Sequence, residues 1–181
     1  MKLIETELPG VVLLEPTVFE DARGHAYESY NQSRFRDLTA MDVTFVQDNR
    51  LRSARNVLRG LHYQVVRPQG KLISVLHGEI YDVAVDLRKS SPRFGKWAGF
   101  TLSAADRRMA WIPPGFAHGF LALADGTDVL YKLSDFWAPE HERVIIWNDS
   151  KLGIRWPIRG EPLLSPRDAK GARLADAELY P

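Results

Sequence analysis

The sequence predicts an all-β domain, an antiparallel sandwich or barrel with only a few short helices. Short runs rich in Ile, Val and Leu recur along the chain, and Gly, Pro, Asp and Asn separate them. In the run from Ile80 to Leu87, two sets of residues alternate with the period of a half-buried strand, namely Ile80, Asp82, Ala84 and Asp86 with Tyr81, Val83, Val85 and Leu87. The length of 181 residues suits a single domain of this class over residues 1–181.

The predicted elements follow from these runs. Lys71–His77 and Glu79–Leu87 form the clearest hairpin, joined at Gly78. Seven further strands are predicted at Leu8–Leu14, Thr44–Gln47, Trp97–Leu102, Arg108–Ile112, Gly119–Ala122, Val129–Leu133 and Val144–Trp147. A short helix is predicted over Ser33–Leu38 with Ser33 as its cap. A second begins at Ser165, because a capping residue, a proline and an acid follow in order.

Composition excludes several classes of protein. The net charge of +1 gives no general attraction to nucleic acid or to an anionic membrane. The chain has no cysteine, which removes disulfides, thiolate metal ligands and cysteine nucleophiles. Glu5 and Glu7 interrupt the place where a signal peptide needs an apolar core, and the uncharged stretch Met109–Ala124 is too short for a membrane helix. We expect a soluble cytoplasmic protein.

A predicted strand around His62 carries a candidate base. Alternation places His62 and Gln64 on one face of this strand and Arg59 on the other. We expect the missing side chain of Gly60 to leave room for a ligand beside the histidine. A lone strand histidine is more often a structural group, but Lys71 follows closely in sequence and favours a functional role.

A second histidine suggests a metal site that the rest of the sequence does not support. A turn with Pro114 and Gly115 precedes a strand and places His118 at the mouth of a barrel, where histidines often bind metals. A metal needs three or four protein ligands. Position 64 is Gln, so the usual His-x-His pair is missing. We therefore expect no bound metal.

Other polar residues allow two interpretations each. Tyr131 fits a core position with its hydroxyl hydrogen-bonded, and Asp168 lies three residues after Ser165, where it can serve a helix cap. The segment Asp21–Glu28 fits a plain turn leading into a strand. The sequence has no Gly-x-Ser-x-Gly elbow and no Gly-rich phosphate loop. An enzyme with these residues has to work by proton transfer through His, Tyr, Asp and Lys.

Taken together, the segments resemble dTDP-4-dehydrorhamnose 3,5-epimerases and related sugar-nucleotide epimerases of the cupin superfamily. Their order and spacing, rather than any one motif, carry the resemblance over nearly the whole chain. The matching motifs are Asp21-x-Arg23-Gly24, Gln47-Asp48-Asn49, Leu58-Arg59-Gly60-Leu61-His62-Tyr63-Gln64, Gln69-Gly70-Lys71, Asp82-Val83-Ala84-Val85-Asp86-Leu87-Arg88, Ser91-Pro92, Pro114-Gly115-Phe116-Ala117-His118-Gly119-Phe120, Tyr131-Lys132, Trp147-Asn148-Asp149 and Trp156-Pro157.

The resemblance implies a cupin-type double-stranded β-helix, a jelly-roll barrel, that forms a homodimer and needs no metal or cofactor. The implied substrate is a dTDP-4-keto-6-deoxyhexose, inverted at C3 and C5 through an enolate on the path to dTDP-L-rhamnose or a related deoxysugar. The resemblance assigns catalytic roles to His62 as base, Tyr131 as acid, Asp168 as partner of the histidine and Lys71 near the 4-keto oxygen. It assigns substrate binding to Arg23, Glu28, Gln47, Asn49, Arg59, His118, Glu142 and Arg167.

The chemistry of these residue types suits that reaction. A cation beside the keto oxygen stabilises an enolate, and a histidine titrates near working pH. The chain departs from the family pattern at His25-Ala26, where an aromatic is expected, and at Phe136-Trp137, where a tyrosine pair is common. These departures leave open a mono-epimerase that inverts only C3 or C5. The sequence also leaves open a 4-keto sugar isomerase and a non-catalytic sugar-binding cupin.

Overall fold

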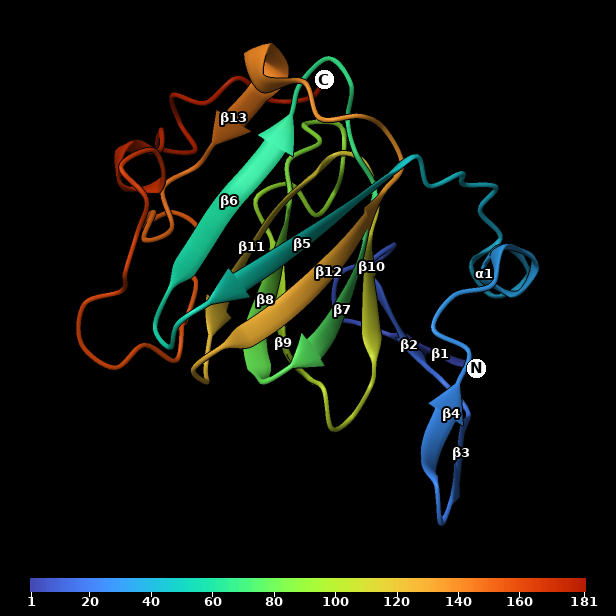
Figure 1. Cartoon of the computed structure of the whole chain (residues 1–181). Helices are drawn as coiled ribbons and strands as arrows, with labels where there is room; N and C mark the ends of the chain where they lie inside the picture. The colour runs from blue at the N-terminus through green and yellow to red at the C-terminus, as the bar shows by residue number, and fades with distance from the viewer.

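The computed structural model describes all 181 residues and confirms the all-β prediction. Two antiparallel sheets pack face to face as the two halves of a jelly roll (Figure 1). In spatial order, the six-stranded sheet contains β1 (Lys2–Glu5), β2 (Val12–Glu15), β10 (Met109–Ile112), β7 (Lys71–His77), β12 (Thr127–Leu133) and β5 (Gln47–Ser53). The five-stranded sheet contains β13 (Glu142–Val144), β6 (Leu58–Gln64), β11 (Phe116–Ala122), β8 (Glu79–Asp86) and β9 (Trp97–Ser103).

The remaining elements lie outside this sandwich. Strands β3 (Val18–Asp21) and β4 (Gly24–Tyr27) form a separate hairpin that projects from the body of the molecule (Figure 1). Helix α1 (Gln32–Thr39) follows the hairpin, and two 3-10 turns, η1 (Pro139–His141) and η2 (Asp168–Lys170), lie near the C-terminal end of the chain. No helix in the structure has the length and apolar character required to cross a membrane.

The buried core continues beyond the space between the sheets, because the C-terminal segment covers the outside of the five-stranded sheet. Ile80 and Ala84 of β8 pack into the space between the sheets. Val83 and Val85, which alternate with them, pack outward against residues that include Leu152 and Tyr180. The alternation predicted for this strand is therefore confirmed, but both of its faces are buried, so it is not the half-buried strand that the pattern suggested.

Several predicted boundaries were wrong, for local reasons. Leu8 lies in a turn closed by the Thr6 hydroxyl, so the strand predicted from residue 8 starts only at residue 12. The cap of α1 is Asn31, whose side chain accepts a hydrogen bond from the Arg34 amide, and Ser33 lies inside the helix. The second predicted helix is only the turn η2.

Strands β5 and β13 also differ from the prediction. The strand predicted over Thr44–Gln47 begins only at residue 47 and runs on to residue 53. The strand predicted over Val144–Trp147 starts two residues earlier and ends at residue 144, after which Ile145 makes only an isolated bridge to Ala172. The first error arises because β5 is nearly all polar and carries little hydrophobic periodicity, and the second because the apolar run of residues 144–147 continues past the end of β13.

A bulge in β6 overturns the predicted facing of its residues. His118 of β11 pairs with His62, whereas Phe120 pairs with Arg59, so β6 holds one residue more than its partner. The extra residue reverses the alternation, and Arg59 reaches the Ser53 hydroxyl of β5 in the other sheet at 3.1 Å. Gly60 leaves no room for a ligand, because a Cβ there would lie 2.6 Å from the Cα of Gly119.

We expect Gly60→Ala to destabilise the fold by about 3 to 5 kcal/mol, the sum of backbone overlap and strain. Gly60 has φ +116°, a region that side chains disfavour, and the atoms it would meet belong to the backbone and cannot rotate away. Gly24→Ala is the matched control, since its φ is +118° with open space around the position. Urea unfolding measures both variants, and equal losses would contradict the close-approach argument.

Candidate active site

Two histidines lie side by side in the five-stranded sheet, and each is paired with its own carboxylate. His62 of β6 and His118 of β11 are direct register partners. The Nε2 atom of His62 lies 2.6 Å from Oδ1 of Asp168, and the Nε2 atom of His118 lies 2.9 Å from Oδ2 of Asp82. The carboxylates reach the histidines from different elements, one from η2 and the other from β8. The site therefore holds two His–Asp pairs.

The contact between His62 and Asp168 decides between the two roles considered for Asp168, a helix cap and a partner of the histidine. The Ser165 hydroxyl accepts a hydrogen bond from the Asp168 amide at 3.0 Å, and the Asp168 carboxylate binds His62 rather than the start of η2. Burial alone would raise the pKa of Asp168, but its hydrogen bond to His62, the charge of that ring and further hydrogen bonds lower it overall. The carboxylate is 5% exposed and the His62 side chain 29%, so only the histidine opens toward solvent.

Lys71 of β7 and Tyr131 of β12 face these histidines from the six-stranded sheet. The Lys71 ammonium donates to the backbone carbonyl of His62 at 3.2 Å, and burial lowers its pKa to about 8 although Glu142 and Asp82 oppose the shift. Burial raises the pKa of Tyr131 well above its ordinary value, and Asp82 adds to this. The tyrosine therefore keeps its proton and can donate it.

The edge of the site consists of polar side chains that form hydrogen bonds with one another. Gln47 and Asn49 lie on β5, where Asn49 pairs with Tyr131, and their side chains are linked at 2.8 Å. Glu142 accepts hydrogen bonds from the indole of Trp137 at 2.8 Å and from Arg167 at 2.6 Å. Burial would raise the pKa of Glu142, but these two donors lower it overall.

Trp137 was singled out from the sequence only as a departure from the family pattern. In the structure its indole binds Glu142, and its backbone amide donates to the side chain of Gln47 at 2.9 Å. Its own side chain remains exposed, as does that of Phe136. Its contacts with two predicted binding residues place it at the edge of the site, and the only signal in the sequence was its unusual identity.

Two predicted binding residues do not join this cluster. Arg23 lies at the tip of the β3–β4 hairpin, where its guanidinium forms a bidentate ion pair with Asp21, and its side chain is 90% exposed. Glu28 accepts from Asn31 at 3.0 Å and lies 3.4 Å from Arg34. Figure 1 shows the hairpin well apart from β6 and β13, which carry His62 and Glu142.

Gln64 has a structural role. Its buried amide donates to the backbone carbonyl of Arg67 at 2.7 Å and accepts from the amide of Ala138 at 2.8 Å. These bonds hold the loop that carries Trp137 against β6. The side chain is therefore committed to backbone atoms, and no three or more His, Cys, Asp or Glu side chains are arranged so that they could hold a metal ion. A site without metal stays a prediction from the sequence.

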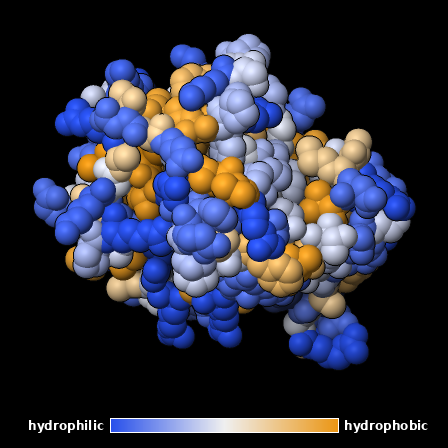
Figure 2. Space-filling model, turned by 90° about the horizontal axis from the view of Figure 1, so that it is seen from above, coloured by the Kyte–Doolittle hydropathy of each residue, from blue (hydrophilic) through white to orange (hydrophobic).

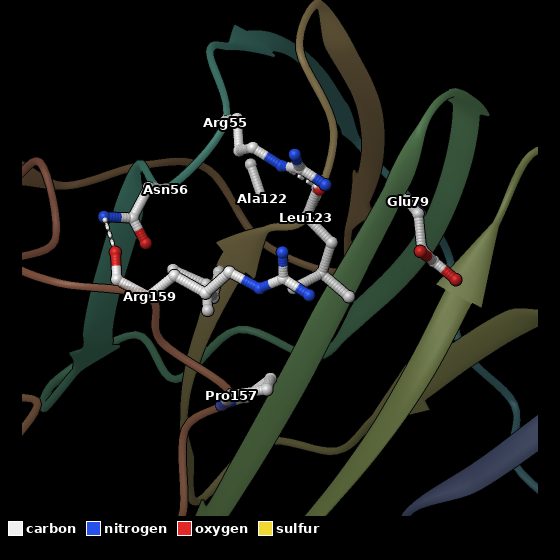
Figure 3. Close-up of a pocket in the computed structure, with 8 residues that line it drawn as sticks. Arg55, Asn56, Glu79, Ala122, Leu123, Pro157 and Arg159 are labelled. Atoms are coloured by element: carbon white, nitrogen blue, oxygen red, sulfur yellow. Dashed lines mark hydrogen bonds between the residues drawn. The ribbon is translucent and has the colours of Figure 1, made fainter.

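A separate cavity of about 360 Å³ lies away from these residues (Figure 3). Arg55 and Arg159 extend across it, Glu79 lies at its side, and none of the predicted site residues lines it. Seen from the end that carries β13, the surface mixes hydrophilic and hydrophobic residues without one dominant apolar area (Figure 2). The two His–Asp pairs therefore remain the strongest candidate for chemistry.

Comparisons with known proteins point to one family. A family model described as dTDP-4-dehydrorhamnose 3,5-epimerase matches residues 5–176. The chain is 55% identical over 181 residues to dTDP-4-dehydrorhamnose 3,5-epimerase of Pseudomonas aeruginosa, covering all of both chains, and 49% identical to that of Shigella flexneri, covering 99% of each. It resembles a crystal structure of dTDP-6-deoxy-D-glucose-3,5-epimerase from Legionella pneumophila in complex with dTDP-4-keto-L-rhamnose. The TM-score is 0.97 at 44% identity, over 99% of this chain and 97% of that one.

Proposed function

The chain belongs to the dTDP-4-dehydrorhamnose 3,5-epimerase family, and on that premise we propose how its own residues carry out the reaction. It is an isomerase that inverts C3 and C5 of dTDP-4-dehydro-6-deoxyglucose to give dTDP-4-dehydro-L-rhamnose. The observation that carries the proposal is the His62–Asp168 pair, which faces Lys71 and Tyr131 across the space between the sheets. Proton transfer alone inverts each carbon, so the proposed reaction needs no redox cofactor.

His62 is the proposed base. Asp168 engages Nε2, so the lone pair on Nδ1 remains to accept a proton from the carbon beside the ketone. As the proton arrives, the ring becomes an imidazolium, and the buried carboxylate stabilises that charge. Asp168 also fixes the orientation of the ring, so the same nitrogen can act at C3 and at C5 in turn.

Lys71 is the proposed stabiliser of the enolate. Removing a proton beside the ketone moves negative charge onto the 4-keto oxygen, and a buried ammonium interacts with that charge more strongly than it would in water. With a pKa of about 8, Lys71 carries its proton at neutral pH. The lysine lies beside the His62 carbonyl, so base and cation act on the same region of the sugar.

Tyr131 is the proposed acid. It belongs to the six-stranded sheet and His62 to the five-stranded one, so a sugar ring between the sheets has one residue on each face. A proton removed on the histidine face and returned on the tyrosine face inverts the carbon. The raised pKa of Tyr131 keeps the donor protonated between turnovers.

Substrate binding is proposed for the polar groups at the edge of the site. The guanidinium groups of Arg59 and Arg167 suit the oxygens of a diphosphate, which they can hold by forked, charge-assisted hydrogen bonds. Gln47, Asn49 and Glu142 offer neutral and anionic hydrogen-bond partners for the sugar or for the nucleobase. These groups come from both sheets and from the C-terminal segment, and Trp137 links two of them by hydrogen bonds to Gln47 and Glu142.

Incubation with dTDP-4-dehydro-6-deoxyglucose in heavy water tests the function. We expect deuterium at both C3 and C5 of the product, because each inversion takes a proton from the solvent pool. Deuterium at one carbon only would identify a mono-epimerase, and a 3-keto product in the NMR spectrum would identify an isomerase. Binding of dTDP without exchange at either carbon, by folded protein, would identify a non-catalytic sugar-binding protein.

The position of Arg23 and Glu28 supports a homodimer in which each chain lends its hairpin to the other. The hairpin carries two predicted binding residues and the exposed Phe19, yet within one chain it does not reach the site. We propose that a second copy of the chain receives it. A two-fold arrangement would then supply Arg23 to both sites by the same contact.

We expect mixed dimers of two inactive variants to recover activity. Arg23→Ala and His62→Ala each inactivate both sites of their own homodimer. A mixed dimer has one site in which both Arg23 and His62 are native. Random exchange after mild denaturation then restores about a quarter of the native sites, as two-fold symmetry requires. Steady-state rates before and after mixing measure this. No recovery, with mixed dimers confirmed by native mass spectrometry, would show that Arg23 acts within its own chain.

A further inference from the structure

The second His–Asp pair is buried more deeply than the first and is incompletely bonded. Asp82 is 0% exposed and His118 3%, and one bond of 2.9 Å joins them. The other carboxylate oxygen, Oδ1 of Asp82, is buried without any hydrogen-bond partner. A buried carboxylate with an unmet oxygen costs stability, and an apolar side chain would hold the barrel together at least as well. The pair therefore calls for an explanation other than folding.

The carboxylate decides which nitrogen of His118 carries a hydrogen. An ionised carboxylate only accepts, so Nε2 of His118 must donate to it and Nδ1 carries the lone pair. Burial lowers the pKa of His118, against the effect of Asp82, and Lys71 and His62 lower it further. The ring is therefore neutral and has one defined acceptor.

That acceptor is free and reachable. Nδ1 of His118 has no hydrogen-bond partner within the chain, since the ring's only bond uses Nε2. Only two side-chain atoms are both fully buried and without a hydrogen-bond partner, Oδ1 of Asp82 and Nε of Arg107. Nδ1 of His118 also lacks a partner but is not one of these two atoms, so it is not fully buried. It can accept a hydrogen bond from a hydroxyl group placed between the sheets.

Asp82 also affects the proposed chemistry through its charge. It raises the pKa of Lys71, which burial lowers, and it raises the pKa of Tyr131 further. Both effects keep Lys71 and Tyr131 protonated, as their proposed roles as cation and acid require. The titratable groups that influence Lys71, or are influenced by it, are Asp82 on β8, His118 on β11 and Glu142 on β13, with His62 on β6 beside it.

We propose that Asp82 is a positioning residue of this site. It holds His118 in one orientation with the hydrogen on Nε2, so that Nδ1 accepts from a sugar hydroxyl, and its negative charge supports the Lys71 cation. Asp82 acts through these neighbours and does not itself touch substrate. The inference rests on the proposed function, because it assumes that the sugar lies between the two sheets.

The tautomer of His118 tests the proposal without reference to activity. In the native protein, nitrogen-15 NMR of the ring should show the hydrogen on Nε2. In Asp82→Asn, the amide can donate to Nε2, and the ring hydrogen then moves to Nδ1. The acceptor becomes a donor, and the shifts of the two nitrogens exchange. A native ring with its hydrogen on Nδ1 overturns the proposal even if the variant does not fold.

Kinetics give the second measurement. We expect kcat/KM of Asp82→Asn to fall by about 10- to 100-fold, the range for a misdirected buried hydrogen bond. Losing the negative charge lowers the pKa of Lys71 below about 8. Activity needs the protonated lysine, so the basic limb of the pH profile moves to lower pH. A purely structural role for Asp82 would not move that limb.

Asp86→Asn is the matched control. Asp86 lies on the same strand and is equally buried, but its carboxylate binds Arg88 and Ser91. We expect this variant to lose stability while keeping the native tautomer and basic limb. If folded Asp82→Asn retains the hydrogen on Nε2 and an unshifted basic limb, the proposal is overturned. If the native enzyme fails to exchange deuterium, the proposed function fails, while the NMR result still decides the role of Asp82 toward His118.

Discussion

His62→Ala abolishes deuterium exchange at C3 and C5 and lowers kcat/KM by at least about 10³-fold, within the range for a lost general base. Neither Asp168 nor Lys71 can replace the histidine. The pKa of Asp168 is lowered, so its carboxylate is a weak base, and Lys71 holds its proton at neutral pH. Proton NMR in heavy water follows both carbons in one experiment.

The control for this variant is another histidine of the chain. His77 lies at the exposed end of β7, where its ring contacts the backbone carbonyl of Gly126 at 3.1 Å. We expect His77→Ala to keep native rates of exchange. His62 is partly exposed, so its removal should leave the fold intact by circular dichroism. Exchange retained by folded His62→Ala would remove this residue from the role of base.

The strands with strong apolar content were predictable from sequence, and the polar ones were not. The β7–β8 hairpin follows from its hydrophobic alternation because both strands pack into the core. Strand β5 consists of Gln47–Ser53, a nearly all-polar run that lies at the edge of its sheet and lines the site. Pairing with β12 holds β5 in place, and a pattern of buried residues in the sequence cannot reveal such pairing.

The candidate site was likewise predictable from the sequence only in part. The resemblance predicted that Asp168 is the partner of His62, but only the fold brings together two residues separated by 106 positions. Asp82 was missed as a functional residue because it sits within an ordinary alternating strand. The available signal was an acid at an inward position, which becomes meaningful only once the register places His118 near it. The bulge that turns Arg59 toward β5 leaves no mark in the hydrophobic pattern.

Tyr131→Phe separates proton removal from inversion. His62 and Lys71 remain in this variant, so the enolate still forms, but the face opposite the histidine has lost its acid. The reprotonation that does occur then comes from the histidine side and restores the original configuration. We expect formation of the inverted product to fall by about 10²- to 10⁴-fold, the usual contribution of a general acid. Recovered substrate should nevertheless carry deuterium.

The hydroxyl of Tyr63 provides the control, since it is buried on the outer side of β6 and donates to the carbonyl of Glu178 at 2.7 Å. Tyr63→Phe should lose some stability and keep the native ratio of exchange to inversion. Loss of exchange and inversion together in Tyr131→Phe would mean that the tyrosine helps to form the enolate. Unchanged inversion would place the acid elsewhere. Deuterium in recovered substrate without inverted product is the result that assigns opposite faces to His62 and Tyr131, as their positions on opposite sheets require.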